Sequence, residues 1–281
     1  MVLDSRELLQ LLTDQLKAHT SFQEARTEAS WLIREYFDLE MAAVLAGREL
    51  NLEDNVLQEW IRGLQAQEPV QYIIGHTWFC GLKIEVNEEV LIPRPETEEL
   101  VYLISQKHPH AKRVLDCCTG SGCIALALKK WIEDCQITAF DVSHGAIEIA
   151  RRNAEKLNLD INFLQADLFA DWPEGGPFDL IVSNPPYVSQ SESSLMEPKV
   201  LNYEPHLALF VPDENPLIFY QALFSKGFLA LASEGDLYAE INPAYSSELI
   251  KLSQKQNWTA AELIVDFLGK ERFIHLKKQA P

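Results

Sequence analysis

The sequence predicts an α/β protein in which helices flank a mainly parallel β-sheet and a small helical domain precedes it. Three observations support this prediction. From residue 110 onward, strand-like and helix-like segments alternate, which is typical of a parallel sheet with helices on both faces. Before residue 70, helical spacing dominates and no strand stands out. Finally, 281 residues with 47% hydrophobic content are sufficient for a packed core.

Residues 1–70 are predicted to form a helical bundle. Leu12 and Leu16 keep helical spacing, and Ser21 followed by Glu24 is a capping-box signature for the next helix. Such apolar stripes are normally the buried faces of helices, so they indicate a core rather than a binding site.

Residues 71–95 are predicted to form a β-hairpin linker, because the segment is rich in β-forming residues and is broken by glycines. Its end, Pro93-Arg94-Pro95, cannot be regular structure up to the second proline. Glu96 can start a helix, because carboxylates are favourable in a first turn. The larger domain is therefore placed at residues 96–281.

Seven strands are expected in the larger part of the chain. They are residues 112–117, 136–142, 161–166, 178–183, 235–241, 258–266 and 272–278. Helices are expected at residues 121–133, 144–157, 215–233 and 245–256. The last two strands must pair antiparallel, because the stretch between them is too short for a crossover helix.

Charge and cysteine content exclude several classes of protein. With 24 basic and 42 acidic residues, the net charge of −18 disfavours nucleic acid as a direct substrate. No apolar run is long enough to span a membrane and no signal segment is visible, so we expect a cytoplasmic protein. We also expect a monomer. The 5 cysteines lack paired C-x-x-C spacing, so neither a disulfide framework nor a metal site is expected.

Three successive strand ends carry residues suited to a nucleoside. The first leads into Asp116-Cys-Cys-Thr-Gly-Ser-Gly-Cys, where glycines at a strand-to-helix turn let a ligand approach the backbone. The second ends at Asp141, which can accept hydrogen bonds from ribose hydroxyls. The third ends at Asp167, which can accept an adenine amino hydrogen, with Leu168 beside the ring. Because Ala125 completes G-x-G-x-x-A, a dinucleotide dehydrogenase remains an alternative.

The fourth strand ends in Asn184-Pro185-Pro186-Tyr187 at the same edge of the sheet. Proline has no N–H, so this turn offers two acceptors, the Asn184 side-chain oxygen and the Pro185 carbonyl. Together they would hold both hydrogens of a planar amide or arylamine, while Tyr187 covers one face of it. Binding those hydrogens out of the plane favours the tetrahedral nitrogen of a transition state. The turn is therefore predicted to be a reacting site for a planar nitrogen.

Taken together, the D-x-x-T-G-S-G loop, Asp141, Asp167 and N-P-P-Y resemble class I S-adenosylmethionine-dependent methyltransferases that act on planar nitrogens. Upstream, E-P-V-Q-Y-I-I-G, W-F-C-G-L and V-L-I-P-R-P-E-T-E-E-L-V resemble the bacterial peptide chain release factor N5-glutamine methyltransferases. The resemblance covers nearly the whole chain. It implies a seven-stranded Rossmann-like sheet preceded by a helical bundle and a hairpin linker.

The resemblance also implies a reaction and its residues. S-adenosylmethionine would methylate the glutamine of the release factors' Gly-Gly-Gln loop, leaving S-adenosylhomocysteine, and the helical domain would dock the release factor. The donor would contact Cys118, Thr119, Gly120, Ser121, Gly122, Asp141, Asp167, Leu168 and Asn184. The glutamine would be held by Asn184, Pro185, Pro186 and Tyr187, with Asn184, Pro185 and Tyr187 as the catalytic residues. The loop around Arg94 would close over the donor or the peptide.

Two alternatives and two departures accompany this resemblance. N-P-P-Y is shared with adenine methyltransferases acting on DNA or RNA, but such an enzyme predicts a basic face. A dehydrogenase leaves N-P-P-Y unexplained. Cys118 stands where the family usually has glycine, which puts donor affinity in question. Glu240 to Tyr245 replace a glycine and glutamine pattern after the fifth strand, in a region expected to lie away from the chemistry.

Overall fold

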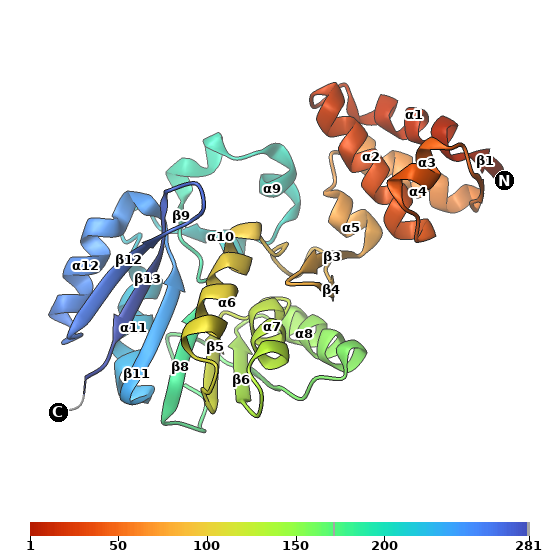
Figure 1. The fold of residues 1–281 in the computed structure, drawn as a ribbon. Helices are drawn as coiled ribbons and strands as arrows, with labels where there is room; N and C mark the ends of the chain where they lie inside the picture. The colour runs from red at the N-terminus through yellow and green to blue at the C-terminus, as the bar shows by residue number, and fades with distance from the viewer. Residues whose placement is uncertain (171, 280–281) are drawn as a thin grey trace. The chain divides into compact units, whose positions relative to one another are not determined.

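Two units make up the chain in a computed structural model that describes residues 1–170 and 172–279 (Figure 1). One unit contains Met1–His76 together with Glu197–Tyr203, and the other contains Thr77–Met196 together with Glu204–Pro281. Over the described residues, none of the helices combines the length and the apolar character that crossing a membrane requires.

Helices form most of the first unit. They are α1 (Ser5–Leu16), α2 (Phe22–Phe37), α3 (Met41–Leu45), α4 (Asp54–Gln65) and α5 (Val70–Ile74). The longer helices each bury one apolar stripe, so that Leu8, Leu32 and Trp60 belong to one core. The Ser21 hydroxyl accepts the N–H of Glu24 at 3.2 Å and caps α2. This is one half of the predicted capping box; the Glu24 carboxylate accepts the Thr20 hydroxyl.

Two local predictions for this unit were wrong. An antiparallel pair, β1 (Val2–Asp4) and β2 (Glu49–Asn51), occupies a region where no strand was expected. Each of these strands has only 3 residues, too few to show alternation of apolar and polar side chains. Residues 71–74, expected to be part of the hairpin, lie in α5. This helix begins after Pro69 and ends at Gly75, whose φ of 81° suits a helix C-terminus.

A segment far along the chain completes the first unit. It contains α9 (Pro198–Tyr203), where the Lys199 ammonium lies 3.1 Å from Oε1 of Glu28 on α2. The Tyr203 hydroxyl donates to the carbonyl of Ala66 at 2.7 Å. The first unit is therefore built from two separate stretches of sequence.

A seven-stranded sheet forms the centre of the second unit (Figure 1). In chain order its strands are β5 (Arg113–Cys117), β6 (Gln136–Asp141), β7 (Asn162–Gln165), β8 (Phe178–Ser183), β11 (Leu231–Glu240), β12 (Ala260–Val265) and β13 (Glu271–Lys277). Their spatial order is β12-β13-β11-β8-β5-β6-β7. All neighbours pair in parallel except β13, which is antiparallel to both β11 and β12. The predicted sheet and its antiparallel final pair are confirmed.

The strand order reverses between β5 and β8, because β6 and β7 lie on one side of this pair and β11 on the other. Open parallel sheets bind ligands at such a reversal, beyond the carboxyl ends of the strands. The topology therefore directs attention to the loops that follow β5 and β8.

Helices cover both faces of the sheet. They are α6 (Pro95–Lys107), α7 (Cys123–Trp131), α8 (His144–Leu157), α11 (Ile218–Ala230) and α12 (Ser246–Lys255). In Figure 1, α6, α7 and α8 lie on one face and α11 on the other. Leu223 of α11 and Leu249 of α12 share a core with Ile181 and Leu237 of the strands. The predicted hairpin consists of β3 (His76–Phe79) and β4 (Leu82–Glu85).

Residues 184–217 hold short elements that the sequence did not predict. They are β9 (Val188–Ser189), η1 (Gln190–Leu195), α9, α10 (His206–Leu209) and β10 (Phe210–Val211). All of them are too short for hydrophobic periodicity to reveal. The next helix was expected to start at Asn215-Pro216, but this pair forms a turn in which the N–H of Ile218 donates to the Asn215 carbonyl at 3.2 Å. α11 therefore begins at Ile218.

Candidate active site

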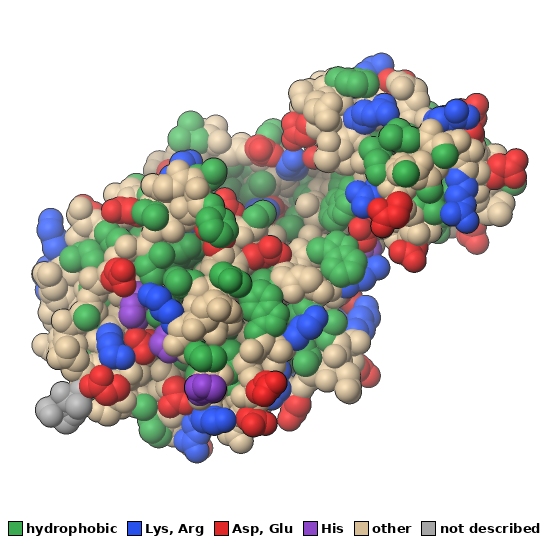
Figure 2. Space-filling model, viewed as in Figure 1, with side chains coloured by type: hydrophobic (Ala, Val, Ile, Leu, Met, Phe, Trp, Pro, Cys, Tyr) green, Lys and Arg blue, Asp and Glu red, His purple; other side chains and the backbone are tan. Residues whose placement is uncertain are grey.

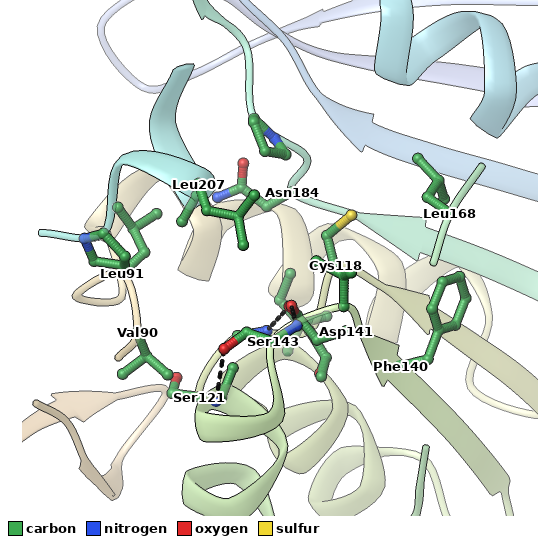
Figure 3. A pocket seen from close by; sticks show the side chains of 18 of the residues that line it. Val90, Leu91, Cys118, Ser121, Phe140, Asp141, Ser143, Leu168, Asn184 and Leu207 are labelled. Atoms are coloured by element: carbon green, nitrogen blue, oxygen red, sulfur yellow. Dashed lines mark hydrogen bonds between the residues drawn. The ribbon is translucent and has the colours of Figure 1, made fainter. Parts of the chain in front are cut away.

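A cavity of about 370 Å³ lies at the carboxyl edge of the sheet (Figure 3). Most residues predicted to bind a donor or a substrate line it, namely Arg94, Cys118, Thr119, Gly120, Ser121, Asp141, Asp167, Leu168, Asn184 and Pro186. Gly122, Pro185 and Tyr187 adjoin these residues in sequence but are not part of the lining. The fold thus brings the ends of four strands, β5, β6, β7 and β8, and one upstream loop around a single space.

The loop between β5 and α7 forms one wall of the cavity. Cys118, Gly120 and Gly122 all have left-handed backbone, with φ values of 59°, 54° and 80°. A Cβ on Gly122 would lie 3.1 Å from Cβ of Ala150 and 3.2 Å from the ring of Phe163. Gly122 therefore allows α7 to start close to Ala150 of α8 and Phe163 of β7.

Cys118 is the residue of this loop that lacks a glycine's freedom. A left-handed conformation costs an L-residue about 1–2 kcal/mol, so the loop is held here against a local preference. Burial, reinforced by the carboxylate of Asp141, raises the pKa of the Cys118 thiol well above its usual value. The thiol is therefore protonated and is not a nucleophile at neutral pH.

Ser121 presents a buried hydroxyl to the cavity. Among the residues that the structure describes, its Oγ has no oxygen or nitrogen partner for a hydrogen bond. The neighbouring Thr119 hydroxyl, in contrast, donates to Oδ2 of Asp116 at 2.6 Å. Buried polar atoms normally have partners, so the Ser121 hydroxyl is suited to a polar group of a ligand.

Asp141 ends β6 beside this loop. Its Oδ2 accepts the N–H of Gly120 at 2.9 Å, and its Oδ1 accepts the N–H of Ser143 at 3.0 Å. These bonds fix the carboxylate, while burial raises its pKa above the ordinary value. Each oxygen keeps further acceptor capacity, so the carboxylate can bind two neighbouring hydroxyl groups.

An apolar wall stands near Asp141. Leu168 is buried and lines the cavity together with Phe140 (Figure 3). Phe169 and Phe219 also line it, with ring centroids 5.0 Å apart. At the start of this wall, Oδ1 of Asp167 accepts the N–H of Phe169 at 2.9 Å. The aromatic residues were missed at the sequence level. Phe140 and Phe219 lie in stretches typical of an ordinary core, and Phe169 lies in the mixed stretch A-D-L-F-A-D, which contains no aromatic motif.

The turn after β8 brings a side-chain amide to the cavity. Nδ2 of Asn184 lies 3.4 Å from Oγ1 of Thr97, a buried residue in the first turn of α6. Pro185 and Pro186 are both buried, and Pro186 lines the cavity with Asn184. Thr97 lines the cavity too, and only its place in a predicted helix start marked it in the sequence.

Glu240, at the end of β11, belongs to this site, and the expectation that its region lies away from the chemistry was wrong. Its Oε1 accepts the Tyr187 hydroxyl and its Oε2 accepts the Thr97 hydroxyl, each at 2.7 Å. β11 lies beside β8 and runs parallel to it, so the two strands end at the same edge. The expectation rested only on the missing glycine and glutamine pattern, and the sequence does not show that β11 lies beside β8.

The upstream loop is held by a second buried carboxylate. Oε2 of Glu204 accepts the N–H of Ile92 at 3.1 Å, and its Oε1 lies 2.7 Å from Nη2 of Arg94. Glu204 is 3% exposed. It precedes Pro205 and Leu207, which line the cavity, so one residue ties two parts of the lining together.

Two family models match the chain: the methyltransferase small domain over residues 96–201 and the PrmC N-terminal domain over residues 7–75. A curated release factor glutamine methyltransferase of Bacteroides thetaiotaomicron is 47% identical over 219 residues, or 78% of this chain and 79% of that protein. The chain belongs to the release factor glutamine methyltransferase family. A second relative of that name, from Flavobacterium psychrophilum, is 37% identical over 90% of this chain and 92% of its own.

Solved structures show the fold of this release factor glutamine methyltransferase family member. A methyltransferase from Pyrococcus furiosus superposes with a TM-score of 0.54 at 21% identity, covering 71% of this chain and 90% of its own. A 16S rRNA methyltransferase from T. thermophilus, bound to AdoMet and guanosine, gives 0.53 at 16%, covering 73% and 50%. The sheet is thus that of a class I S-adenosylmethionine-dependent methyltransferase, as the sequence predicted.

Proposed function

We propose that this chain transfers the methyl group of S-adenosylmethionine to the side-chain amide nitrogen of the glutamine in the Gly-Gly-Gln motif of peptide chain release factors, releasing S-adenosylhomocysteine. The observation that carries the proposal is the Asn184 amide on the cavity wall, whose nitrogen faces Thr97 at 3.4 Å. Its oxygen is thereby left as an acceptor for a substrate amide. The name shared by the relatives supports release factors as the substrate.

The residues of the cavity fit the donor. The Ser121 hydroxyl, which has no oxygen or nitrogen partner among the described residues, suits its amino-acid portion, and Asp141 suits its ribose hydroxyls. Leu168 and Phe140 offer an apolar surface for adenine, with Asp167 beside them for the adenine amino group. When bound, the donor supplies a methyl group that its sulfonium already activates. The protein therefore needs to orient the reactants more than to generate a strong nucleophile.

We assign binding of the substrate's reacting amide nitrogen to Asn184 and Pro185. The Asn184 oxygen and the Pro185 carbonyl would each accept one hydrogen of the glutamine amide, and Pro185 and Pro186 add no backbone N–H donor to this turn. Holding both hydrogens away from the amide plane favours a pyramidal nitrogen, which resembles the transition state. Tyr187 would cover one face of this nitrogen, and its hydroxyl bond to Glu240 supports a fixed ring.

The domain roles are part of the proposal. Residues 1–70 would dock the release factor, residues 71–95 would link the domains, and residues 96–281 would bind the donor. The match of the helical region to the family's N-terminal domain model supports the first role. The Arg94 loop would close over the donor or the peptide, which its place in the cavity lining supports. The reaction would take place in the cytoplasm, where peptide chains are terminated.

Methylation of adenine in DNA or RNA is not favoured. The chain's net charge of −18 opposes binding of a phosphate backbone, and the curated relatives are named for release factors.

The decisive experiment offers radiolabelled S-adenosylmethionine with release factor, DNA or RNA, and then locates the label by peptide mapping. We expect label on the Gly-Gly-Gln glutamine and none on a release factor in which that glutamine is replaced by alanine. Label on nucleic acid, or label elsewhere on the release factor that survives this replacement, would refute the proposed function.

A further inference from the structure

Glu240 joins three separate parts of the active site through hydrogen bonds. It is 1% exposed, and its two carboxylate oxygens accept from hydroxyl groups on α6 and on the turn after β8. The Thr97 hydroxyl, one of these donors, also contacts Asn184 at 3.4 Å. A series of hydrogen-bonded polar groups, here called the Glu240 relay, therefore runs from the end of β11 to the amide at the cavity wall.

The number of available hydrogens decides which group donates and which accepts in each bond of the Glu240 relay. A carboxylate can only accept, so the single hydroxyl hydrogen of Thr97 is used on Glu240. Toward Asn184 the Thr97 oxygen can then only accept, and the amide group that faces it must be the NH2 group. The oxygen of Asn184 is left for another donor.

We propose that Glu240 is a positioning residue, which sets through Thr97 the end of the Asn184 amide that meets the substrate and fixes Tyr187 beside it. This inference rests on the proposed function. An Asn184 amide rotated by half a turn would present its NH2 group to the substrate's NH2 group, and two donors cannot bond each other. Glu240 thus controls the chemistry without touching the reacting atoms.

The surroundings of Glu240 bear on its charge. Burial raises its pKa, while the hydroxyl groups of Thr97 and Tyr187 and the positive charge of Arg272 favour the ionised form. Glu96 is a nearby like charge that acts with burial. Protonation would turn one carboxylate oxygen into a donor and release the direction of the Thr97 hydroxyl. Orientation of the amide therefore depends on an ionised Glu240.

A matched pair of variants tests the proposal. Thr97→Val keeps the shape of the side chain and removes the hydroxyl, whereas Thr97→Ser keeps the hydroxyl. We expect T97V to lower kcat by about 10- to 100-fold, the range found when a residue that orients a metal ligand is lost, because Thr97 orients Asn184 in the same way. KM for the donor should change little, and T97S should recover most of the turnover. Ser105→Ala, further along α6, controls for loss of a helix hydroxyl that bonds only a local carbonyl.

Glu240→Gln provides a second route that does not depend on Thr97. In the wild type, kcat should fall as acid protonates Glu240, at a pH above its ordinary pKa of 4.5. In E240Q, kcat should be low throughout and should lack this acid limb. Equal turnover for T97V and wild type, equal damage by T97S and T97V, or an unchanged acid limb in E240Q would overturn the proposal.

A structural readout separates this inference from the proposed function. The side-chain NH2 resonances of Asn184, identified by their loss in Asn184→Ala, should shift and exchange faster with solvent in T97V but not in T97S. This measurement needs no substrate, so it stands even if wild-type enzyme fails to label a release factor. Unchanged resonances in T97V would show that Thr97 does not orient the Asn184 amide and that the Glu240 relay does not exist.

Discussion

The guanidinium of Arg94 lies 2.7 Å from a carboxylate oxygen of Glu204 whose side chain is 1% exposed. The same carboxylate accepts the backbone N–H of Ile92. It therefore fixes both the side chain and the backbone of the loop that lines the cavity upstream of α6. Figure 2 shows hydrophobic and charged side chains intermixed over one face of the molecule. Unlike such surface charges, the Glu204 carboxylate is buried, while the Arg94 side chain is 31% exposed.

Glu204→Ala should loosen this loop. It leaves the Ile92 N–H unpaired, at a cost of about 1–3 kcal/mol, and frees Arg94. We expect donor affinity, measured by calorimetry, to fall about tenfold, and the loop to become sensitive to limited proteolysis. Glu204→Gln keeps one acceptor and should fall between wild type and E204A. Identical affinities in all three proteins would show that the loop does not respond to this carboxylate.

Asn184→Ala should reduce kcat by about 10² or more while donor binding survives, the scale seen when one oriented polar partner is removed. The reason is that the alanine side chain offers no acceptor to the amide. Asn215→Ala, at another Asn-Pro pair outside the cavity lining, is the matched control and should retain turnover. Near-normal turnover for N184A would contradict the assignment.

Asp141→Ala should weaken the donor rather than slow a saturated reaction. Its carboxylate is held by Gly120 and Ser143 in the cavity wall, where it would bind ribose hydroxyls. Loss of hydrogen bonds to a charged group corresponds to about 1.5–3 kcal/mol, or roughly a 10- to 150-fold rise in Kd. Calorimetry with S-adenosylmethionine measures this, with exposed Asp160→Ala as the control. Unchanged donor affinity in D141A would refute the ribose role.

Asp116 should make folding stability depend on pH. Burial raises its pKa from 3.8 to about 7, so between these values the folded state binds a proton that the unfolded state has lost. Its contribution to stability is therefore favourable below pH 3.8 and declines as pH rises to about 7. Asp116→Asn removes this titration. In urea unfolding from pH 4 to 8, the free energy of unfolding of D116N should rise relative to that of the wild type as the pH rises. A difference that stays constant with pH would exclude the effect.

Cys118→Gly and Cys118→Ala separate backbone strain from the thiol. Both remove the sulfur, but glycine accepts a φ of 59° without strain. C118G should be more stable than C118A to urea by about 1 kcal/mol. If the two variants have the same urea midpoint of unfolding, the loop is not strained at residue 118.

Long elements could be predicted from the sequence, because each carries its own pattern. α8 spans His144–Leu157, the predicted bounds, since its stripe of buried residues and the Ser143 cap are local features. The strand ends at Asp141 and Asn184 followed from the same patterns. Glu204 and Glu240 could not be found this way. Their partners lie 110 and 143 residues away in sequence, and only the folded sheet and its loops bring them together.

The segment Glu197–Tyr203 has a practical consequence for dividing the protein. A fragment that starts at Thr77 would still carry α9, with Lys199 and Tyr203 deprived of Glu28 and Ala66. The next residue is Glu204, which holds the Arg94 loop. An isolated catalytic fragment would thus carry a helix without its packing partners, immediately before the residue that holds the Arg94 loop. The N-terminal unit supplies the packing partners of α9, so the N-terminal and catalytic units are best studied together in the full chain.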